Sequence, residues 1–222
     1  MIPSALLVLA ATYAALMLWR YGRRGLLVAA PGLVRLRSDP EASAATAAQR
    51  QAGGDLEAMG FRRIGARSEE GPLGGLDLRS DAWVHEAEGA WADVFEAPPR
   101  PGAGARLYFL SVFPDGALAL TANHPRPSRS DGTVETGGLP DASPSATWAA
   151  HRRAVGRLAE RHGRPRAAPD LAGREAAARA WYRAAGRREL RRLFLLHFLN
   201  ALFAAAVLGY AVYGLLRSPR AP

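Results

Sequence analysis

Residues 106–122 read RLYFLSVFPDGALALTA and define the centre of this 222-residue chain. Apolar and aromatic residues flank Pro114-Asp115-Gly116, which predicts two strands joined by a tight turn, since the proline presets φ and the glycine accepts positive φ. A bulged turn makes one face of this hairpin mainly aliphatic, and that face contains Tyr108, Leu110, Val112, Leu118 and Leu120. The other face is only partly apolar, and it contains Phe109, Ser111, Phe113 and Thr121.

A second hairpin is predicted just before the first one. Residues 83–87 and 90–96 flank Glu88-Gly89, a tight-turn signal. A two-residue turn sets His85 opposite Ala92, so His85 and Asp93 point to opposite faces and form no catalytic dyad. Asp93 then shares a face with two aromatic residues, and we expect it at a partly exposed edge. Short turns exclude long crossovers, which predicts an α+β fold with a small antiparallel sheet of about four strands.

Helices are expected on both sides of this sheet. Ser143-Pro144 begins a helix that runs to His162 and is closed by Gly163, with an apolar stripe of Trp148, Val155, Leu158 and Ala159. We expect Trp148 to share one core with the aliphatic face of the first hairpin. Residues 123–143 are polar and rich in proline and glycine, and a loop of that length is either functional or disordered.

We predict that the α+β domain covers residues 55–163. Residues 20–54 are expected to form a juxtamembrane segment and an alanine-rich helical spacer, with a helix start at Asp39-Pro40-Glu41 and an end at Gly53-Gly54. Residues 169–192 are expected to form a basic juxtamembrane helix.

An uncharged apolar run stands at each end of the chain, at residues 2–19 and 193–216. Each is long enough to cross a hydrocarbon core of about 30 Å as a helix, and we interpret both as transmembrane helices. A signal peptide is the alternative for the first run, but its basic residues follow the run instead of preceding it. A buried core helix is the alternative for the second.

The arginines beside these runs predict the topology. Ten lie on the central side of the two runs: Arg20, Arg23, Arg24, Arg35, Arg37, Arg183, Arg187, Arg188, Arg191 and Arg192. Only Arg217 and Arg220 lie beyond them. By the positive-inside rule, the central domain is cytoplasmic, both termini lie outside, and the protein resides in the cell (inner) membrane.

The composition of the chain argues against several classes of partner and cofactor. The net charge is +9, but the chain has no lysine and its arginines gather beside the spans, so topology explains much of the charge and no nucleic-acid partner is expected. The absence of cysteine excludes disulfides and thiolate chemistry. The five histidines are not spaced as one metal site, and no phosphate-binding or nucleophile-elbow motif is present, so we predict no metal and no cofactor.

Two groups of residues are candidates for function. Three polar residues are candidates for a catalytic site, Ser111, Asn123 and His124, and together with Thr121 they could line the mouth of a shallow pocket. The favoured alternative is the ordinary polarity of a solvent-facing sheet surface. A basic stripe could bind anionic lipid headgroups, beyond any role in topology, and it comprises Arg179, Arg183, Arg187, Arg188, Arg191 and Arg192. We expect this helix to begin near Leu171 and to continue into the second span, with a bend allowed at Gly186.

The spans themselves suggest contacts with protein. Small residues recur every four positions at Ala10 and Ala14, and at Ala201, Ala205 and Gly209, which favours close helix approach or self-association. His197 and Asn200 are polar residues within the second span and are expected to face protein. The leading hypothesis is a two-span membrane protein whose central domain docks a partner. A membrane-tethered hydrolase and a sensor of anionic lipid or a small ligand are the alternatives.

Overall fold

The computed structural model describes residues 4–29, 34–40, 46–74, 77–95 and 104–217. The chain divides into two compact units. One comprises residues 35–69 and 78–186, and the other comprises residues 1–34, 70–77 and 187–222.

The first unit is built on a mixed sheet. In the described part of the chain, the sheet has eight strands in the order β1-β2-β3-β4-β5-β6-β8-β7. Their bounds are β1 Arg35–Asp39, β2 Arg62–Glu70, β3 Asp77–His85, β4 Ala90–Phe95, β5 Arg106–Val112, β6 Leu118–Ala122, β7 Arg129–Ser130 and β8 Val134–Gly138. The expectation of about four antiparallel strands is therefore wrong in number, and β6 pairs with β8 in parallel. Strands such as β8 (VETGG) lack an alternating pattern and form because a neighbouring strand satisfies their backbone.

The two central hairpins follow the predicted faces. Leu118 pairs with Val112 and Leu120 with Leu110, as expected. His85 pairs with Ala90 instead of Ala92, because four residues form the turn, but the shift by two positions leaves His85 and Asp93 on opposite faces. Asp93 is fully buried, which corrects its expected place at an exposed edge.

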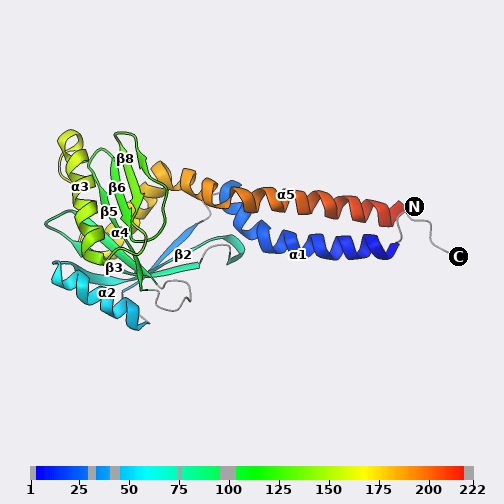
Figure 1. Ribbon diagram of the computed structural model, residues 1–222, viewed down its shortest axis with the longest axis horizontal. Helices are drawn as coiled ribbons and strands as arrows, with labels where there is room; N and C mark the ends of the chain where they lie inside the picture. The colour runs from blue at the N-terminus through cyan, green and yellow to red at the C-terminus, as the bar shows by residue number, and fades with distance from the viewer. Residues whose placement is uncertain (1–3, 30–33, 41–45, 75–76, 96–103, 218–222) are drawn as a thin grey trace. The chain divides into compact units, whose positions relative to one another are not determined.

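Helices cover both faces of this sheet (Figure 1). Two of them, α2 Ala47–Ala58 and α3 Pro144–His162, lie on one face, and α4 Leu171–Trp181 packs on β5 and β1. The expected caps of α3, Ser143 and Gly163, are both present. A capping box of Thr46 and Gln49 starts α2, which continues through Gly53-Gly54, the expected end of the spacer. The expected helix start falls in strand β1 at Asp39, and Glu41 lies outside the described residues.

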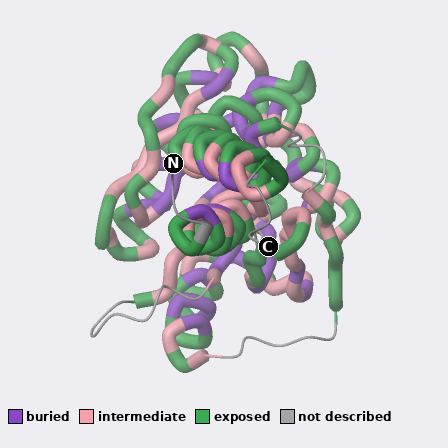
Figure 2. The backbone as a smooth tube through the Cα atoms, turned by 90° about the vertical axis from the view of Figure 1, so that its right-hand side faces the viewer, coloured by how far each residue is buried: buried purple, intermediate pink, exposed green. Residues whose placement is uncertain are grey.

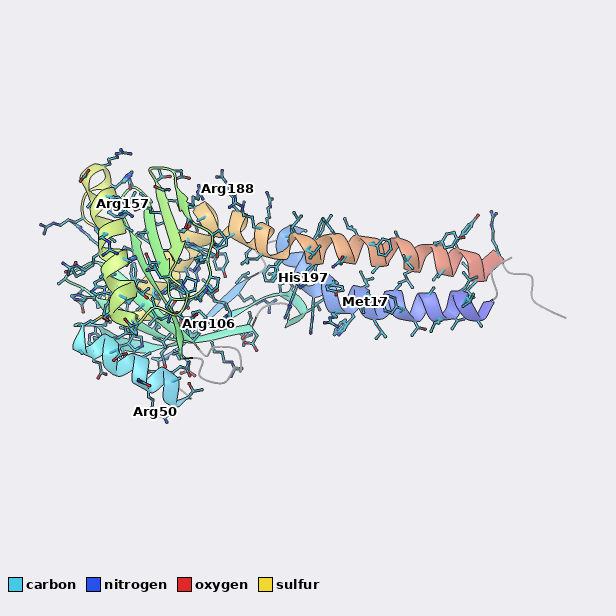
Figure 3. All side chains as sticks on the ribbon, in the orientation of Figure 1. Met17, Arg50, Arg106, Arg157, Arg188 and His197 are labelled. Atoms are coloured by element: carbon cyan, nitrogen blue, oxygen red, sulfur yellow. The ribbon has the colours of Figure 1, made fainter. Side chains whose placement is uncertain are left out.

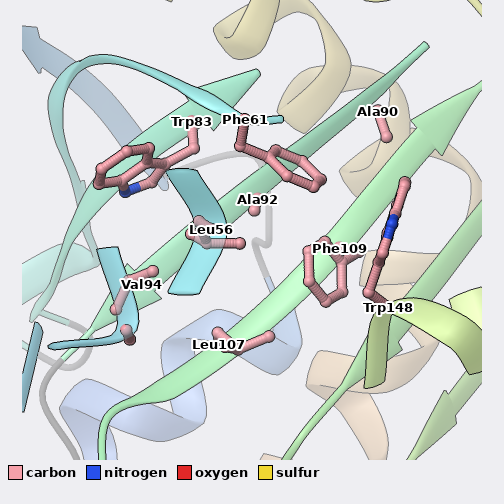
Figure 4. Packing of buried hydrophobic residues seen from close by; sticks show 10 residues of the cluster. Leu56, Phe61, Trp83, Ala90, Ala92, Val94, Leu107, Phe109 and Trp148 are labelled. Carbon is pink, nitrogen blue, oxygen red and sulfur yellow. The ribbon is translucent and has the colours of Figure 1, made fainter. Parts of the chain in front are cut away.

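Separate hydrophobic clusters form on the two faces of the sheet, and the largest cluster on each face is its main core. Trp148 packs with Phe61, Phe109 and Leu56 beneath α2 and α3 (Figure 4). The aliphatic face of the first hairpin packs instead with Ala177 and Trp181. The prediction that Trp148 shares a core with Leu110 is therefore wrong, because α3 covers the face that carries Phe109 and Ser111 and leaves the Leu110 face to α4.

The second unit is an antiparallel helical hairpin of α1 Ser4–Ala29 and α5 Arg187–Arg217. Close approaches of Gly25 to Phe198 and of Gly214 to Leu7 fix the antiparallel direction. A short 3₁₀ turn, η2 Pro72–Gly74, packs against α1. Residues 171–217 are helical throughout, as expected, with a π-helical segment, η3 Tyr182–Gly186, between α4 and α5.

A heptad pattern forms the seam of this hairpin. On α5, buried and half-buried residues alternate at steps of four and three: Leu190, Phe194, His197, Ala201, Ala204, Leu208, Ala211 and Leu215. On α1, positions seven apart face the seam: Leu7, Ala14, Tyr21 and Val28. This is the spacing of a coiled coil. The expected ridge of Ala201, Ala205 and Gly209 is thus only partly right, because Ala205 and Gly209 are exposed.

The outside of the hairpin is apolar. Large side chains such as Leu196 and Phe203 are 67 % and 73 % exposed, and Figure 2 shows that most of both helices is not buried. Among the described residues, two helices are long and apolar enough to cross a membrane. The most apolar 18-residue stretch has a mean hydropathy of 1.4 in Ala5–Ala29 and of 1.9 in Leu171–Arg217.

Candidate functional site

The most polar part of the first unit is a buried ionic cluster centred on Asp93. Arg67 of β2 donates from Nη1 to Asp93 Oδ2 at 2.6 Å, and Arg174 of α4 donates from Nε to Asp93 Oδ1 at 3.3 Å. The Tyr108 hydroxyl, from β5, donates to the same carboxylate. Asp93, Arg67 and Arg174 are 0 %, 3 % and 1 % exposed. Three strands and one helix therefore meet on one carboxylate.

The charges in this cluster stabilise one another. Burial would raise the pKa of Asp93, but the positive charges of Arg174 and Arg67 outweigh it and hold that pKa below its usual value. Burial, followed by the charge of Asp93, raises the pKa of the Tyr108 hydroxyl. The carboxylate is therefore ionised and the phenol neutral at neutral pH.

A second carboxylate completes the balance of charge. Glu69 forms an ion pair with Arg67 and accepts a hydrogen bond of 2.5 Å from the Tyr182 hydroxyl of η3. Two arginines thus face two carboxylates. Arg126 lies over the rings of Tyr108 and Trp181, with Cζ 5.8 Å and 5.2 Å from their centroids. The cluster holds α4 and η3 against the sheet, which is a structural role.

Sequence reasoning missed both arginines of this cluster. Arg67 lies in a strand without a clear apolar alternation, and Arg174 lies outside the predicted domain of residues 55–163. One signal was present: Asp93 stands between Trp91 and Phe95 on the inward face of a strand. A carboxylate at such a position requires buried cationic partners.

The three candidate catalytic residues and Thr121 do not converge on one face of the sheet. Ser111 and Thr121 are buried beneath α3, where His151 contacts the Ser111 hydroxyl through Nε2 at 3.1 Å and the Thr121 hydroxyl through Nδ1 at 3.2 Å. The Asn123 carboxamide bonds to the backbone of Leu107 and Ala105 and so closes the edge of the hairpin. His124 lies on the opposite face against Phe95, with ring centroids 5.5 Å apart.

Ser111 and His151 are side chains of the types that serve as nucleophile and base, but a substrate has no access to them from solvent. Both side chains are fully buried, and the second nitrogen of His151 meets a hydroxyl where a catalytic triad has a carboxylate. Burial lowers the pKa of His151 to about 3, and burial with the charge of Arg126 lowers the pKa of His124 to about 4. Among the described residues, no group of three or more metal-ligating side chains could hold a metal ion.

A polar groove lies at the edge of the sheet formed by residues 123–143. It has a volume of about 360 Å³ between α3 and the β7–β8 edge. Arg157 of α3 donates to Glu135 Oε1 at 2.7 Å, and Figure 3 labels Arg157 on this helix. Two buried atoms of its lining have no hydrogen-bond partner within the described residues, Arg129 Nη1 and Glu135 Oε2. The segment predicted to be either functional or disordered therefore forms one wall of a groove, and two unpaired polar atoms are buried in its lining.

All six arginines of the basic stripe are exposed. Arg179 pairs with Glu175 at 3.0 Å within α4. In the helical hairpin, His197 lies at the seam (Figure 3), 5.6 Å from the Tyr21 ring by centroids and 3.5 Å from Arg24 Nη1, so it faces protein as expected. Asn200 is half-buried.

No protein-family model, curated protein or solved structure matches this chain.

Proposed function

We propose that this protein is a two-span integral membrane protein whose central α+β domain is a cytoplasmic docking module. One observation carries the membrane part: large apolar side chains such as Leu196 and Phe203 are exposed on the outside of the helical hairpin. The seam includes small residues, with alanines at 14, 201, 204 and 211 and close approaches at Gly25 and Gly214. A soluble hairpin buries its large apolar residues, whereas a hairpin in lipid packs small residues together and exposes large ones.

The arginines support the orientation. Arg20, Arg23 and Arg24 on α1 and Arg187, Arg188, Arg191 and Arg192 on α5 flank the same end of the antiparallel hairpin. The positive-inside rule places that end at the cytoplasmic surface. The exposed stripe there contacts anionic headgroups, each arginine contributing on the order of 1 kcal/mol.

The topology can be tested with single cysteines, since the chain has none. Ser218→Cys should react with a membrane-impermeant maleimide in intact cells, and Ser145→Cys should react only after permeabilisation. Replacing Arg187, Arg188, Arg191 and Arg192 with Gln should give a mixed population, in which each cysteine is labelled partly in intact cells and partly only after permeabilisation. Replacing Arg152, Arg153, Arg161 and Arg164 with Gln removes equal charge at positions distant from the span in sequence and should leave the topology intact. Labelling of Ser145→Cys in intact cells would refute the orientation.

The polar groove supports the docking role. Its unpaired Arg129 Nη1 and Glu135 Oε2 suit a partner segment that offers both an acceptor and a donor. In the interior, Ser111 contacts His151 and Asp93 pairs with Arg174, so the surface is what the domain presents to other molecules. Solvent does not reach Ser111, which argues against the hydrolase hypothesis.

Capture of partners by the intact protein in detergent tests this role. Ser130→Trp obstructs the groove, and Ala149→Trp places the same bulk on an exposed position of α3 that does not line it. Proteins captured by the wild type and by Ala149→Trp but lost with Ser130→Trp are the expected result. An identical set from all three would exclude the groove as the docking site.

A further inference from the structure

We propose that the helical hairpin binds one anionic phospholipid, with an acyl chain in a groove between α1 and α5 and the phosphate at Arg23. This proposal rests on the proposed membrane location and goes beyond it, since it assigns a discrete lipid site to α1, separate from the basic stripe.

The groove has the chemistry of an acyl-chain site. It has a volume of about 480 Å³, and its walls are almost entirely apolar, including Ala15, Leu18 and Trp19 on α1 and Leu202, Ala205 and Leu208 on α5. It exists because Gly22 and Ala205 are small: a Cβ on Gly22 would meet only Leu18, at 3.7 Å. The helices are nevertheless in contact at the seam, where Gly25 approaches Phe198 closely.

The length of the groove matches one leaflet. From Ala15 to Arg23, where the phosphate would lie, its lining on α1 extends roughly 12 Å along a helix at 1.5 Å per residue. Half of a hydrocarbon core of about 30 Å is of similar length. A groove of this length accommodates one acyl chain from the leaflet on the arginine side.

Arg23 supplies the charge that selects an anionic headgroup. It is the one charged residue of the described groove lining, and its Nε is buried with no hydrogen-bond partner in the described part of the chain. A buried guanidinium N–H without an acceptor is costly, and a phosphate oxygen is the acceptor that arginine fits best. Trp19, one turn earlier, is a side chain typical of the membrane interface. Arg23 thus lies where a phosphate would be when the chain fills the groove.

Two matched pairs of variants test this site in the full-length protein. Arg23→Gln removes the phosphate ligand, and Arg20→Gln removes the same charge from an exposed position on the same helix. Gly22→Leu fills the groove, and Gly209→Leu adds the same side chain where nothing lies within 4 Å and no groove residue is involved. Each protein is reconstituted with equal amounts of dioleoylphosphatidylglycerol and dioleoylphosphatidylcholine, extracted in mild detergent and weighed by native mass spectrometry.

The wild type, Arg20→Gln and Gly209→Leu should each retain one phosphatidylglycerol per chain. Arg23→Gln and Gly22→Leu should retain it at least tenfold less. Equal retention by Arg23→Gln and Arg20→Gln, or equal retention of phosphatidylcholine by the wild type, would overturn the site. Alkaline extraction of membranes separates the two proposals: a wild type that stays in the membrane but retains no lipid refutes only the lipid site, whereas release of the wild type refutes the membrane location and the lipid site with it.

Discussion

Arg174 of α4 and Asp93 of β4 form an ion pair in the interior of the domain, and neither side chain is reached by solvent. The two residues are far apart in sequence, and they join the helix that leads into the second apolar run to the centre of the sheet. Arg67 and Tyr108 contact the same carboxylate, so the pair belongs to a network in which each charge depends on the others.

Removal of the Asp93 charge should strongly destabilise the domain. Asp93→Asn keeps the shape but leaves Arg67 and Arg174 buried without their shared carboxylate, which should cost about 3–5 kcal/mol. Arg174→Met should cost less, because Arg67 still neutralises Asp93. Unfolding by urea in detergent, followed by tryptophan fluorescence, measures both.

Arg179→Met is the control for this series, since Arg179 lies on the same helix and is exposed. Its pair with Glu175 should contribute only about 0.3–0.5 kcal/mol. An Asp93→Asn protein as stable as Arg179→Met would show that the buried network does not hold α4 on the sheet.

The stability of the domain should fall with acid because of His151. Burial lowers the pKa of His151 to about 3 in the folded protein, while its usual value is about 6.5. The unfolded chain therefore binds the extra proton between these values, and stability is lost as pH falls from about 6.5 towards 3, by up to about 1.4 kcal/mol per pH unit. His151→Gln should flatten this part of the profile.

His162→Gln serves as a control of opposite sign. The hydrogen bond from His162 to Asp115 raises the pKa of His162, so its contribution is present at low pH and is lost as pH rises through the raised value. A wild-type profile that His151→Gln leaves unchanged between pH 6.5 and 3 would mean that His151 is protonated in the folded state.

Gly53 should be less tolerant of substitution than its neighbour. A Cβ on Gly53 would lie 2.8 Å from the Trp83 ring, whereas a Cβ on Gly54 would meet nothing within 4 Å. Gly54→Ala should stabilise α2 by up to about 1 kcal/mol, because alanine favours helix more than glycine does. Gly53→Ala gains the same propensity but forces Trp83 out of its packing, so its midpoint of thermal unfolding should lie below that of Gly54→Ala. Equal midpoints would contradict the packing of α2 on Trp83.

Double-mutant cycles should separate the two cores. Phe109 and Trp148 are in contact, with centroids 5.0 Å apart, so Phe109→Leu and Trp148→Phe should couple by about 0.5–3 kcal/mol. Leu110 lies on the opposite face, where Leu110→Ala should cost about 2–5 kcal/mol. Its effect should add to that of Trp148→Phe within about 0.5 kcal/mol. Strong coupling between Leu110 and Trp148 would instead indicate one shared core.

The features predicted correctly from sequence are those that neighbouring residues determine. The turn at Pro114-Asp115-Gly116 sets the register of β5 and β6, and Ser143 and Gly163 cap α3, because these signals act over a few residues of backbone. The apolar runs at the two ends are also local, since their length and lack of charge are properties of composition. The alternating pattern of 106–122 likewise assigned each side chain to a face.

The tertiary structure determined which helix covers each face, and with it the two cores, the place of Trp148 and the sealing of Ser111 beneath α3. It also determined strands β1 and β8, which have no pattern of their own, and the partners of Asp93. These features depend on contacts between residues distant in the chain, such as Asp93 with Arg67 and Arg174. A buried carboxylate is stable only where such charges converge, as at Asp93. That convergence depends on the packed fold, because periodicity along the chain does not indicate which distant residues contact each other.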